Sequence, residues 1–315
     1  MLPWLQVAAG LILLVASAEV LVRGASALAA RFGLSPLAIG LTIVAYGTSA
    51  PEFAVSLFAA WTGNPGIVVG NVIGSNVANL GLVLGFVALI RPLAARHSLL
   101  KKEVPFLLVS TALIPIGALG GFYSRVEGFL LLTGAVVFSA YCFMSAKKEP
   151  AGAEAINEPP PPGPKSLPVM AALILGGFVG LGAGSNVLVT GAVTIAEAFG
   201  LSDHVIGLTL VALGTSLPEL ATCTIGAIRG QVDLVVGNII GSNVFNVFFI
   251  LGGTAAVHPI PAPPMLLGAD VVIMLILSLA LVPFILTGAR ISRMEGAAYF
   301  LMYLGFIVAS LIVRA

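Results

Sequence analysis

The stretch IGLTIVAYGTSAPEF, residues 39–53, returns as IGLTLVALGTSLPEL at residues 206–220. A second stretch, GNVIGSNVAN at residues 70–79, returns as GNIIGSNVFN at residues 237–246. The same offset of 167 residues separates both pairs without a gap. The chain therefore consists of two related halves, and each carries a proline–glutamate pair inside an otherwise apolar run.

The composition identifies these apolar runs as membrane spans. Of the 315 residues, 59% are hydrophobic and only 9% are charged, with a mean hydropathy of +1.12. Soluble domains carry about 25% charged residues, so we expect an integral membrane protein surrounded by lipid. A net charge of +1 offers no basic patch large enough for a nucleic-acid partner. The two cysteines, Cys142 and Cys223, lie in apolar segments and are interpreted as small buried side chains.

Ten apolar segments are long enough to cross a bilayer, which takes about 20 residues of helix. The first begins without a basic leader, so we expect it to be retained as a span. The predicted spans are 3–31, 35–60, 67–91, 102–121, 125–145, 167–197, 203–228, 233–257, 266–288 and 292–313.

Residues 147–166, KKEPAGAEAINEPPPPGPKS, form a charged, proline-rich linker between the halves. A fainter echo, SRVEG at 124–128 and SRMEG at 292–296, extends the repeat to the last span of each half. Each half, 1–146 and 167–315, thus holds five spans, and because five is odd the second half enters the membrane from the opposite face. The predicted fold is all-α, with ten transmembrane helices in two inverted five-helix repeats and broken helices at a midplane site, as in secondary transporters.

Lysine and arginine are unevenly distributed between the two predicted faces. Eleven lie in loops after odd-numbered spans, and only two, Arg125 and Arg314, lie on the opposite side. Because positive side chains stay in the cytoplasm, we expect a multi-pass protein of the plasma membrane. Its linker, 147–166, should be cytoplasmic, and its N- and C-termini should lie outside.

The proline of the GTSxPE motif explains how a glutamate can stand inside a span. Pro51 has no backbone N–H and should free carbonyls three or four residues upstream, near Ala45, Gly47 and Thr48. In hydrocarbon a free carbonyl is costly unless something binds it, and a cation is a natural partner. Glu52 lies about one turn from Thr48 on the same helix face. The second half repeats this arrangement 167 residues further on.

The GNxIGSNVxN motif supplies neutral oxygen atoms. Asn71, Ser75 and Asn79 follow one another at four-residue spacing, so one helix face carries amide, hydroxyl and amide oxygens. Inverting one half onto the other brings four oxygen-rich helix segments together near the midplane. All three histidines fall near span ends, so nitrogen ligands are absent from the site. This inventory suits a hard cation, Ca²⁺ or Na⁺, rather than Zn²⁺ or Cu²⁺.

The two glutamates also predict exchange rather than leak. Together they bring a charge of about −2, which one Ca²⁺ or two Na⁺ would neutralise. An empty site with both carboxyl groups ionised is unfavourable in a low dielectric. We therefore expect bound cations, or a proton on one carboxylate, at all times.

With these two motif pairs the chain resembles the sodium/calcium exchanger family, within the calcium/cation antiporter superfamily. It looks like a small prokaryotic-type member without a cytoplasmic regulatory domain, and the resemblance covers nearly the whole chain. The resemblance implies alternating access that couples Na⁺ entry to Ca²⁺ extrusion, with net movement of charge. We expect a transporter that is not an enzyme, that needs no cofactor beyond the transported ions, and that functions as a monomer.

The resemblance also implies a set of ion ligands that repeats between the halves. Glu52 and Glu219 match the carboxylates shared by Ca²⁺ and Na⁺. The other matched positions are Thr48 and Thr215 (backbone oxygens of the central site), Ser49 and Ser216 (Na⁺ ligands beside them), Ala45 and Ala212 (carbonyls), Ser75 and Ser242 (hydroxyls of outer Na⁺ sites), and Asn79 and Asn246. Some members carry one aspartate in the last pair, whereas both residues are asparagine here. Two central carboxylates argue against a potassium-coupled or strongly proton-sensitive variant.

Other interpretations remain open. Within transport, the alternative is a proton- or potassium-coupled Ca²⁺/cation exchanger. A cation channel would arrange its filter around an axis along the pore, which antiparallel repeats do not. An intramembrane hydrolase using Ser49 or Ser216 lacks a histidine or lysine placed as its base. Glu19 and Arg23, four residues apart in the first span, are interpreted as a local ion pair near the cytoplasmic end rather than as coupling residues.

Overall fold

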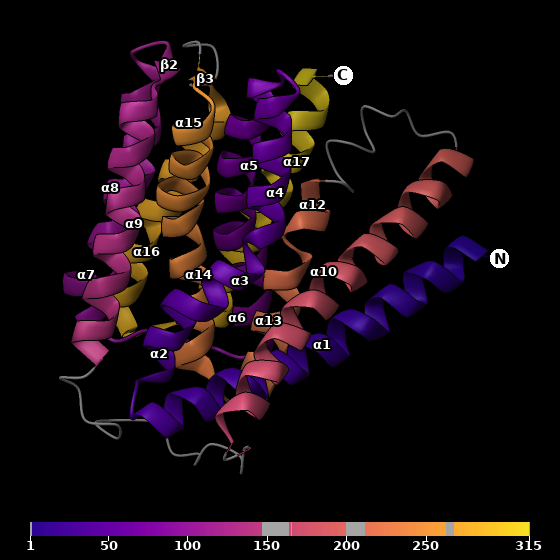
Figure 1. Cartoon of the computed structure of the whole chain (residues 1–315), viewed down its shortest axis with the longest axis vertical. Coiled ribbons are helices and arrows are strands. Elements are labelled where there is room, and N and C mark those ends of the chain that lie inside the picture. The colour runs from indigo at the N-terminus through magenta and orange to yellow at the C-terminus, as the bar shows by residue number, and fades with distance from the viewer. Residues whose placement is uncertain (1, 147–163, 165, 200–211, 263–267, 315) are drawn as a thin grey trace.

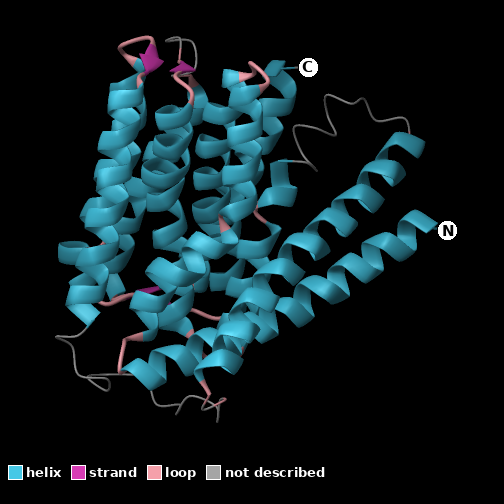
Figure 2. Ribbon diagram, viewed as in Figure 1, coloured by secondary structure: helices cyan, strands magenta, loops and turns pink. Residues whose placement is uncertain are grey.

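The computed structural model of the protein describes residues 2–146, 164, 166–199, 212–262 and 268–314. These residues fold almost entirely into helices, which form a bundle with two long helices, α1 and α10, lying obliquely against it (Figure 1 and Figure 2). The helices of the first half are α1 (Leu2–Phe32), α2 (Pro36–Ile39), η1 (Gly40–Val44), α3 (Ala45–Thr48), α4 (Ala50–Trp61), α5 (Pro65–Val77), η2 (Ala78–Leu84), α6 (Gly85–Ile90), α7 (Ser98–Lys102), α8 (Val104–Ala118) and α9 (Arg125–Ala146). Those of the second half are α10 (Leu167–Ala198), α12 (Ala212–Thr215), α13 (Leu217–Ile228), α14 (Val232–Phe245), η4 (Asn246–Leu251), α15 (Gly252–Val257), α16 (Ala269–Gly288) and α17 (Arg293–Arg314).

The predicted membrane spans coincide with helices wherever the chain is described. In the described part of the chain, six helices are long and apolar enough to cross a membrane, or seven if the bent pair 36–48 and 50–61 counts as one span. Two further apolar helices, Val104–Ala118 and Leu217–Ile228, are shorter. An all-α protein with several membrane spans is thus confirmed, whereas the number ten stays a prediction.

Parts of three predicted segments lie outside the described residues. They are most of the linker 147–166, the first part of the span 203–228 and the start of the span 266–288. The division of the chain at the linker therefore stays a prediction, although α9 ends at Ala146 and α10 begins at Leu167.

Helix breaks interrupt the second span of the first half and the corresponding segment of the second half. Between α3 and α4 the axis bends by 43°, and Ser49 at the break has φ −85° and ψ 6°. Pro51 lies in the first turn of α4, where no N–H is needed. Ser216 (φ −89°, ψ 2°) and Pro218 form the same break between α12 and α13. The predicted broken helices are confirmed, and each break puts a glutamate in the first turn of the next helix.

Among the described residues, three helical segments are π-helical, with wider turns than an α-helix. They are η1, η2 and η4, and the last two begin within one residue of equivalent positions in the repeat. Asn79 lies in η2 and Asn246 in η4. Because π-helical turns are rare and often occur at functional sites, the position of both asparagines in π-helical turns supports their assignment to the candidate site.

Two short antiparallel strand pairs join the halves. β1 (Leu93–Ala94) pairs with β4 (Arg290–Ile291), and β2 (Phe122–Tyr123) pairs with β3 (Ile260–Pro261). In the repeat β1 corresponds to β3 and β2 to β4, so each pair is the exchanged copy of the other. Figure 2 shows one pair at the top of the bundle and the other toward its lower end. A reciprocal pairing of this kind is expected of two inverted repeats.

Close helix contacts at glycines also pair an element of one half with an element of the other half. A Cβ atom added to Gly85 of α6 would lie 2.7 Å from the backbone nitrogen of Phe300 in α17. One added to Gly252 of α15 would lie 2.7 Å from Cβ of Leu131 in α9. The third span of each half therefore packs at backbone distance against the last span of the other half. The halves interlock and do not form two separate bundles.

The SRVEG and SRMEG segments form helix N-terminal capping boxes. Glu127 Oε2 accepts from the backbone N–H of Ser124 at 2.7 Å, and the Ser124 hydroxyl accepts from the N–H of Glu127 at 3.2 Å. Ser292 and Glu295 make the same reciprocal pair at 2.6 and 3.3 Å. Each box satisfies backbone donors at the start of the last helix of its half.

The two long helices, α1 and α10, pack against each other in antiparallel fashion. A Cβ added to Gly10 of α1 would lie 2.5 Å from the backbone of Leu188, and one added to Gly184 of α10 would lie 2.9 Å from the backbone of Leu14. Such close approach along their length indicates that α1 and α10 form one rigid pair.

We expect the interlocking glycines to determine stability. Replacing Gly85 or Gly252 by valine should lower the free energy of unfolding by about 1–3 kcal/mol, because the side chain must displace the facing helix. Gly305→Val in α17 is the matched control, since nothing lies within 4 Å of a Cβ there. Thermal unfolding in detergent measures the effect. Equal melting temperatures for all three variants would contradict the proposed interlock.

Candidate functional site

Two buried carboxyl groups lie at the centre of the candidate ion site. Glu52 of α4 and Glu219 of α13 are each 1% exposed. They come from opposite halves of the chain. The Ser49 hydroxyl at the first helix break donates to Glu219 Oε1 at 3.1 Å. The two breaks therefore meet inside the bundle, away from its ends (Figure 1).

Several buried oxygen atoms of the predicted ligands have no hydrogen-bond partner. They are Glu52 Oε2, Glu219 Oε2, Ser216 Oγ, Asn79 Oδ1 and Asn246 Oδ1. Leaving a buried acceptor unpaired costs about 1–3 kcal/mol, and more for a charged group. An ionised carboxylate can only accept hydrogen bonds, so its oxygens cannot be paired with other acceptor oxygens of the protein. A bound cation would interact favourably with all of them.

The donor set suits a hard cation. Within the described ranges, no three histidine, cysteine, aspartate or glutamate side chains form a group able to hold a metal ion. A cation at Glu52 and Glu219 would complete its shell with hydroxyl, amide and backbone oxygens, which is the chemistry of Ca²⁺ and Na⁺ sites.

The backbone at the first break differs in part from the prediction. The N–H of Ser49 donates to the Ala45 carbonyl at 3.1 Å, and the Thr48 hydroxyl approaches the same oxygen at 3.5 Å. The Ala45 carbonyl is therefore not freed by the break, because Pro51 lies too far along the chain to remove its hydrogen bond. Its second lone pair can still bind a cation. Across the break, in this described segment, no backbone N–H reaches the Thr48 carbonyl. That oxygen lies one turn before Glu52, as expected.

The remaining predicted ligands lie in the helices around the breaks. Ser75 of α5 and Ser242 of α14 are buried, and the Ser242 hydroxyl donates to Asn238 Oδ1 at 3.5 Å. Ala212 and Thr215 form the short helix α12, immediately before the second break.

The amide groups of Asn71 and Asn238 donate hydrogen bonds within their own halves. The Asn71 amide donates to the Glu52 carbonyl at 2.9 Å and to the Ser56 hydroxyl at 2.8 Å. The Asn238 amide donates to Cys223 Sγ at 3.3 Å, while its oxygen accepts from Thr48 at 3.3 Å. In the second half, Cys223 thus accepts the bond that Ser56 accepts in the first half. Sequence reasoning took it for a packing residue, although its offset of 167 from Ser56 marks the shared role.

A further cross-half bond links two asparagines. The Asn246 amide donates to Asn76 Oδ1 at 3.0 Å. Asn76 was not predicted as a site residue, although it lies in the repeated GSN triplet. Its equivalent, Asn243, instead donates to the Ile239 carbonyl at 2.7 Å. The two halves therefore bring the same side chains into different hydrogen-bond arrangements.

Known proteins are similar to this chain in sequence and in fold. The sequence model of the family described as sodium/calcium exchanger protein matches residues 2–144 and 169–312. The putative antiporter CaxA of Alkalimonas amylolytica is 42% identical over 304 residues, which cover 94% of this chain and 95% of that protein. The sodium/calcium exchanger MaX1 of Methanosarcina acetivorans is 35% identical, with 95% of each chain covered. A structure of the sodium-calcium exchanger NCX_Mj, soaked with 2.5 mM Na⁺ and 0.1 mM Ca²⁺, has a TM-score of 0.83 at 32% identity and 99% coverage of both chains.

Interlocked inverted repeats whose helix breaks meet at a buried carboxylate pair define a secondary transporter, not an enzyme. Within that class the chain belongs to the sodium/calcium exchanger family. Family and fold together support exchange of cations, including Ca²⁺, across a membrane.

The role of Cys223 can be tested with its counterpart in the repeat. Cys223→Ser should keep the melting temperature and the Ca²⁺-induced stabilisation near wild type, because a serine accepts the equivalent bond at Ser56. Cys223→Val should lose about 1–2 kcal/mol of stability by leaving the Asn238 amide without that acceptor. Thermal unfolding with and without Ca²⁺ measures both variants. If serine and valine behave alike, Cys223 is only a packing residue.

Proposed function

We propose that the protein exchanges Na⁺ for Ca²⁺ by alternating access at a site shared by Glu52 and Glu219. The supporting observation is that both carboxyl groups are buried, come from opposite halves and each leave one oxygen unpaired. Their charge of about −2 is balanced by one Ca²⁺ or by two Na⁺. The two ions therefore compete for one site, which is the requirement for antiport.

The twelve predicted ligands fit this role as one set. The carboxylates are shared by both ions, and the neutral oxygens around them complete the coordination shells. The proposed ligands are Ala45, Thr48, Ser49, Glu52, Ser75, Asn79, Ala212, Thr215, Ser216, Glu219, Ser242 and Asn246. Additional Na⁺ bound by Ser75 and Ser242 would make exchange electrogenic, since more positive charge then enters with Na⁺ than leaves with Ca²⁺.

The orientation in the plasma membrane follows from the basic residues. We place the end of the bundle with β1, β4 and Arg229 in the cytoplasm, together with the linker 147–166, and both termini outside. The contacts that join the two halves occur within one chain, which supports function as a monomer.

Na⁺-driven Ca²⁺ flux is the direct test. Purified protein in Na⁺-loaded liposomes should take up ⁴⁵Ca²⁺ when diluted into Na⁺-free medium, and uptake should stop when the Na⁺ gradient is abolished. A potential clamped with valinomycin and K⁺ should change the rate if exchange is electrogenic. Uptake that ignores the Na⁺ gradient would exclude Na⁺ as the coupling ion.

Proton coupling is the alternative that a specific observation supports. The unpaired Oε2 atoms of Glu52 and Glu219 are buried acceptors that can also be satisfied by taking up a proton. Uptake driven by a pH gradient at zero Na⁺ would identify a proton-coupled exchanger, and uptake driven only by K⁺ would identify a potassium-coupled one.

Neutralising either glutamate should abolish Ca²⁺ transport. Glu52→Gln or Glu219→Gln leaves one carboxylate for a divalent cation, and we expect Ca²⁺ flux to fall by at least about 100-fold. Glu197→Gln, an exposed acid at the end of α10, is the matched control and should transport normally. Near-normal Ca²⁺ flux in both site variants would defeat the assignment.

A further inference from the structure

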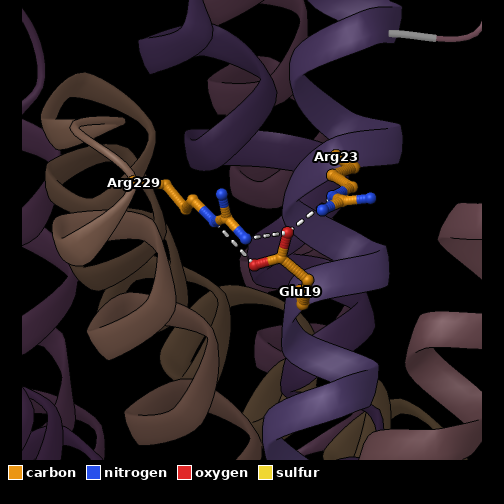
Figure 3. Close-up of polar contacts among 3 residues, drawn as sticks. All are labelled: Glu19, Arg23 and Arg229. Carbon is orange, nitrogen blue, oxygen red and sulfur yellow. Dashed lines mark hydrogen bonds and ion pairs between the residues drawn. The ribbon is translucent and has the colours of Figure 1, made fainter. Parts of the chain in front are cut away.

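A bidentate ion pair ties α1 to the end of α13 (Figure 3). Glu19 Oε2 accepts from Arg229 Nε at 2.8 Å, and Glu19 Oε1 lies 2.7 Å from Arg229 Nη2. Arg23, one turn along α1, contacts the same carboxylate at 2.5 Å. The predicted pair of Glu19 and Arg23 is therefore confirmed, but it is part of a contact between two helices that sequence spacing did not reveal.

The repeat provides no equivalent of this ion pair. At the positions 167 residues away, Glu19 becomes Asn186, Arg23 becomes Thr190 and Arg229 corresponds to Thr62. A second polar contact nearby, from the Ser26 hydroxyl to the Gln231 side chain at 3.1 Å, also has no equivalent, because Val193 and Asn64 occupy the corresponding positions. The two ends of the carrier are thus chemically unequal.

The packing is unequal in the same sense. Helix α1 packs along α13, whereas α10 and α4, which hold the equivalent positions, make no comparable contact among their described residues. Figure 1 shows the upper ends of α1 and α10 diverging from the bundle, while their lower parts lie beside it. Under the proposed alternating access, this unequal packing corresponds to the state that is closed at the end where α1 meets α13.

In a carrier made of inverted repeats, residues without a counterpart in the other half determine which access state is more stable. If the halves had identical sequences, exchanging their conformations would yield the same molecule turned over, and the two states would have equal free energy. Any preference must come from residues without a counterpart in the repeat. The ion pair between Glu19 and Arg229 has no such counterpart. It joins α1 to α13, which are in contact, whereas among the described residues the equivalent helices α10 and α4 are not packed together in this way.

We propose that Glu19 and Arg229 are positioning residues that hold α1 against α13 and favour the access state closed at that end. The proposal rests on the proposed exchange function, because an alternating carrier needs two states of similar energy. A bidentate pair with Glu19 mostly buried and Arg229 about half exposed should shift such an equilibrium by about fivefold.

Distance measurement tests the proposal without transport. Spin labels on Phe58→Cys of α4 and Phe199→Cys at the end of α10, both exposed, report whether α10 lies along α4. The background carries Cys142→Ser and Cys223→Ser. Glu19→Asn and Arg229→Thr, each taken from the other half of the repeat, should raise the ratio of short to long distances about fivefold.

Three further variants serve as controls in that measurement. Arg23→Thr removes only the contact within α1 and should match wild type. The charge swap Glu19→Arg with Arg229→Glu should restore the long distance, and Thr62→Arg with Asn186→Glu should enrich the short one. Wild-type distance distributions in both Glu19→Asn and Arg229→Thr would overturn the proposal.

Sided transport kinetics provide a second readout. Because apparent affinity scales with the fraction of carriers open to a face, the KM for Ca²⁺ should fall at the face bearing Arg229 and rise at the other. We expect the ratio of the two KM values to change about fivefold in Glu19→Asn and Arg229→Thr, and an unchanged ratio would contradict the proposal. If the wild-type protein carried no Ca²⁺, the proposed function would be wrong, and the distances would still decide the role of the ion pair.

Discussion

The structure depends on burying two carboxyl groups, one from each half, inside the helix bundle. Glu52 and Glu219 are both buried, so any charge that they carry must be balanced by the surrounding groups or by bound ions. A helix break supplies such groups from the backbone itself. In the proposed site it directs the N-terminus of α4 or α13 toward a carboxylate, and the last carbonyls of α3 or α12 toward the cation that we propose to bind there. The proline that produces the break and the glutamate that follows it therefore act together.

The site needs both halves, and the fold ensures that they stay together. Strand pairs and glycine contacts are exchanged between halves, so the third span of each half packs against the last span of the other half. The interlock leaves α1 and α10, which pack on each other, as the elements least integrated into the bundle. A rigid core with a separate helix pair is an arrangement in which access can change while the breaks remain in place.

Sequence reasoning succeeded where the physics is local or is repeated. Apolar length located the helices, the offset of 167 paired the halves, and Pro51 and Pro218 marked the breaks. It failed where a contact depends on tertiary placement. The bond from Asn246 to Asn76 and the ion pair from Glu19 to Arg229 join residues 170 and 210 positions apart, so no spacing rule brings them together. The π-helical turns were also missed, since their apolar pattern resembles that of an α-helix.

The matched ligands are arranged asymmetrically, and this asymmetry has a physical meaning. Ser49 donates to Glu219, but the mirror bond from Ser216 to Glu52 is not made, and both of those side chains keep an unpaired oxygen. The asparagine bond between the halves is likewise formed in one sense only. Each hydrogen-bonding side chain is present in both halves, but each bond between the halves is formed in only one of its two possible senses. The mirror arrangement of these bonds should therefore have a similar energy. Exchanging these bonds between halves would carry the site into its mirror state without any new chemistry, as a carrier that alternates between two faces requires.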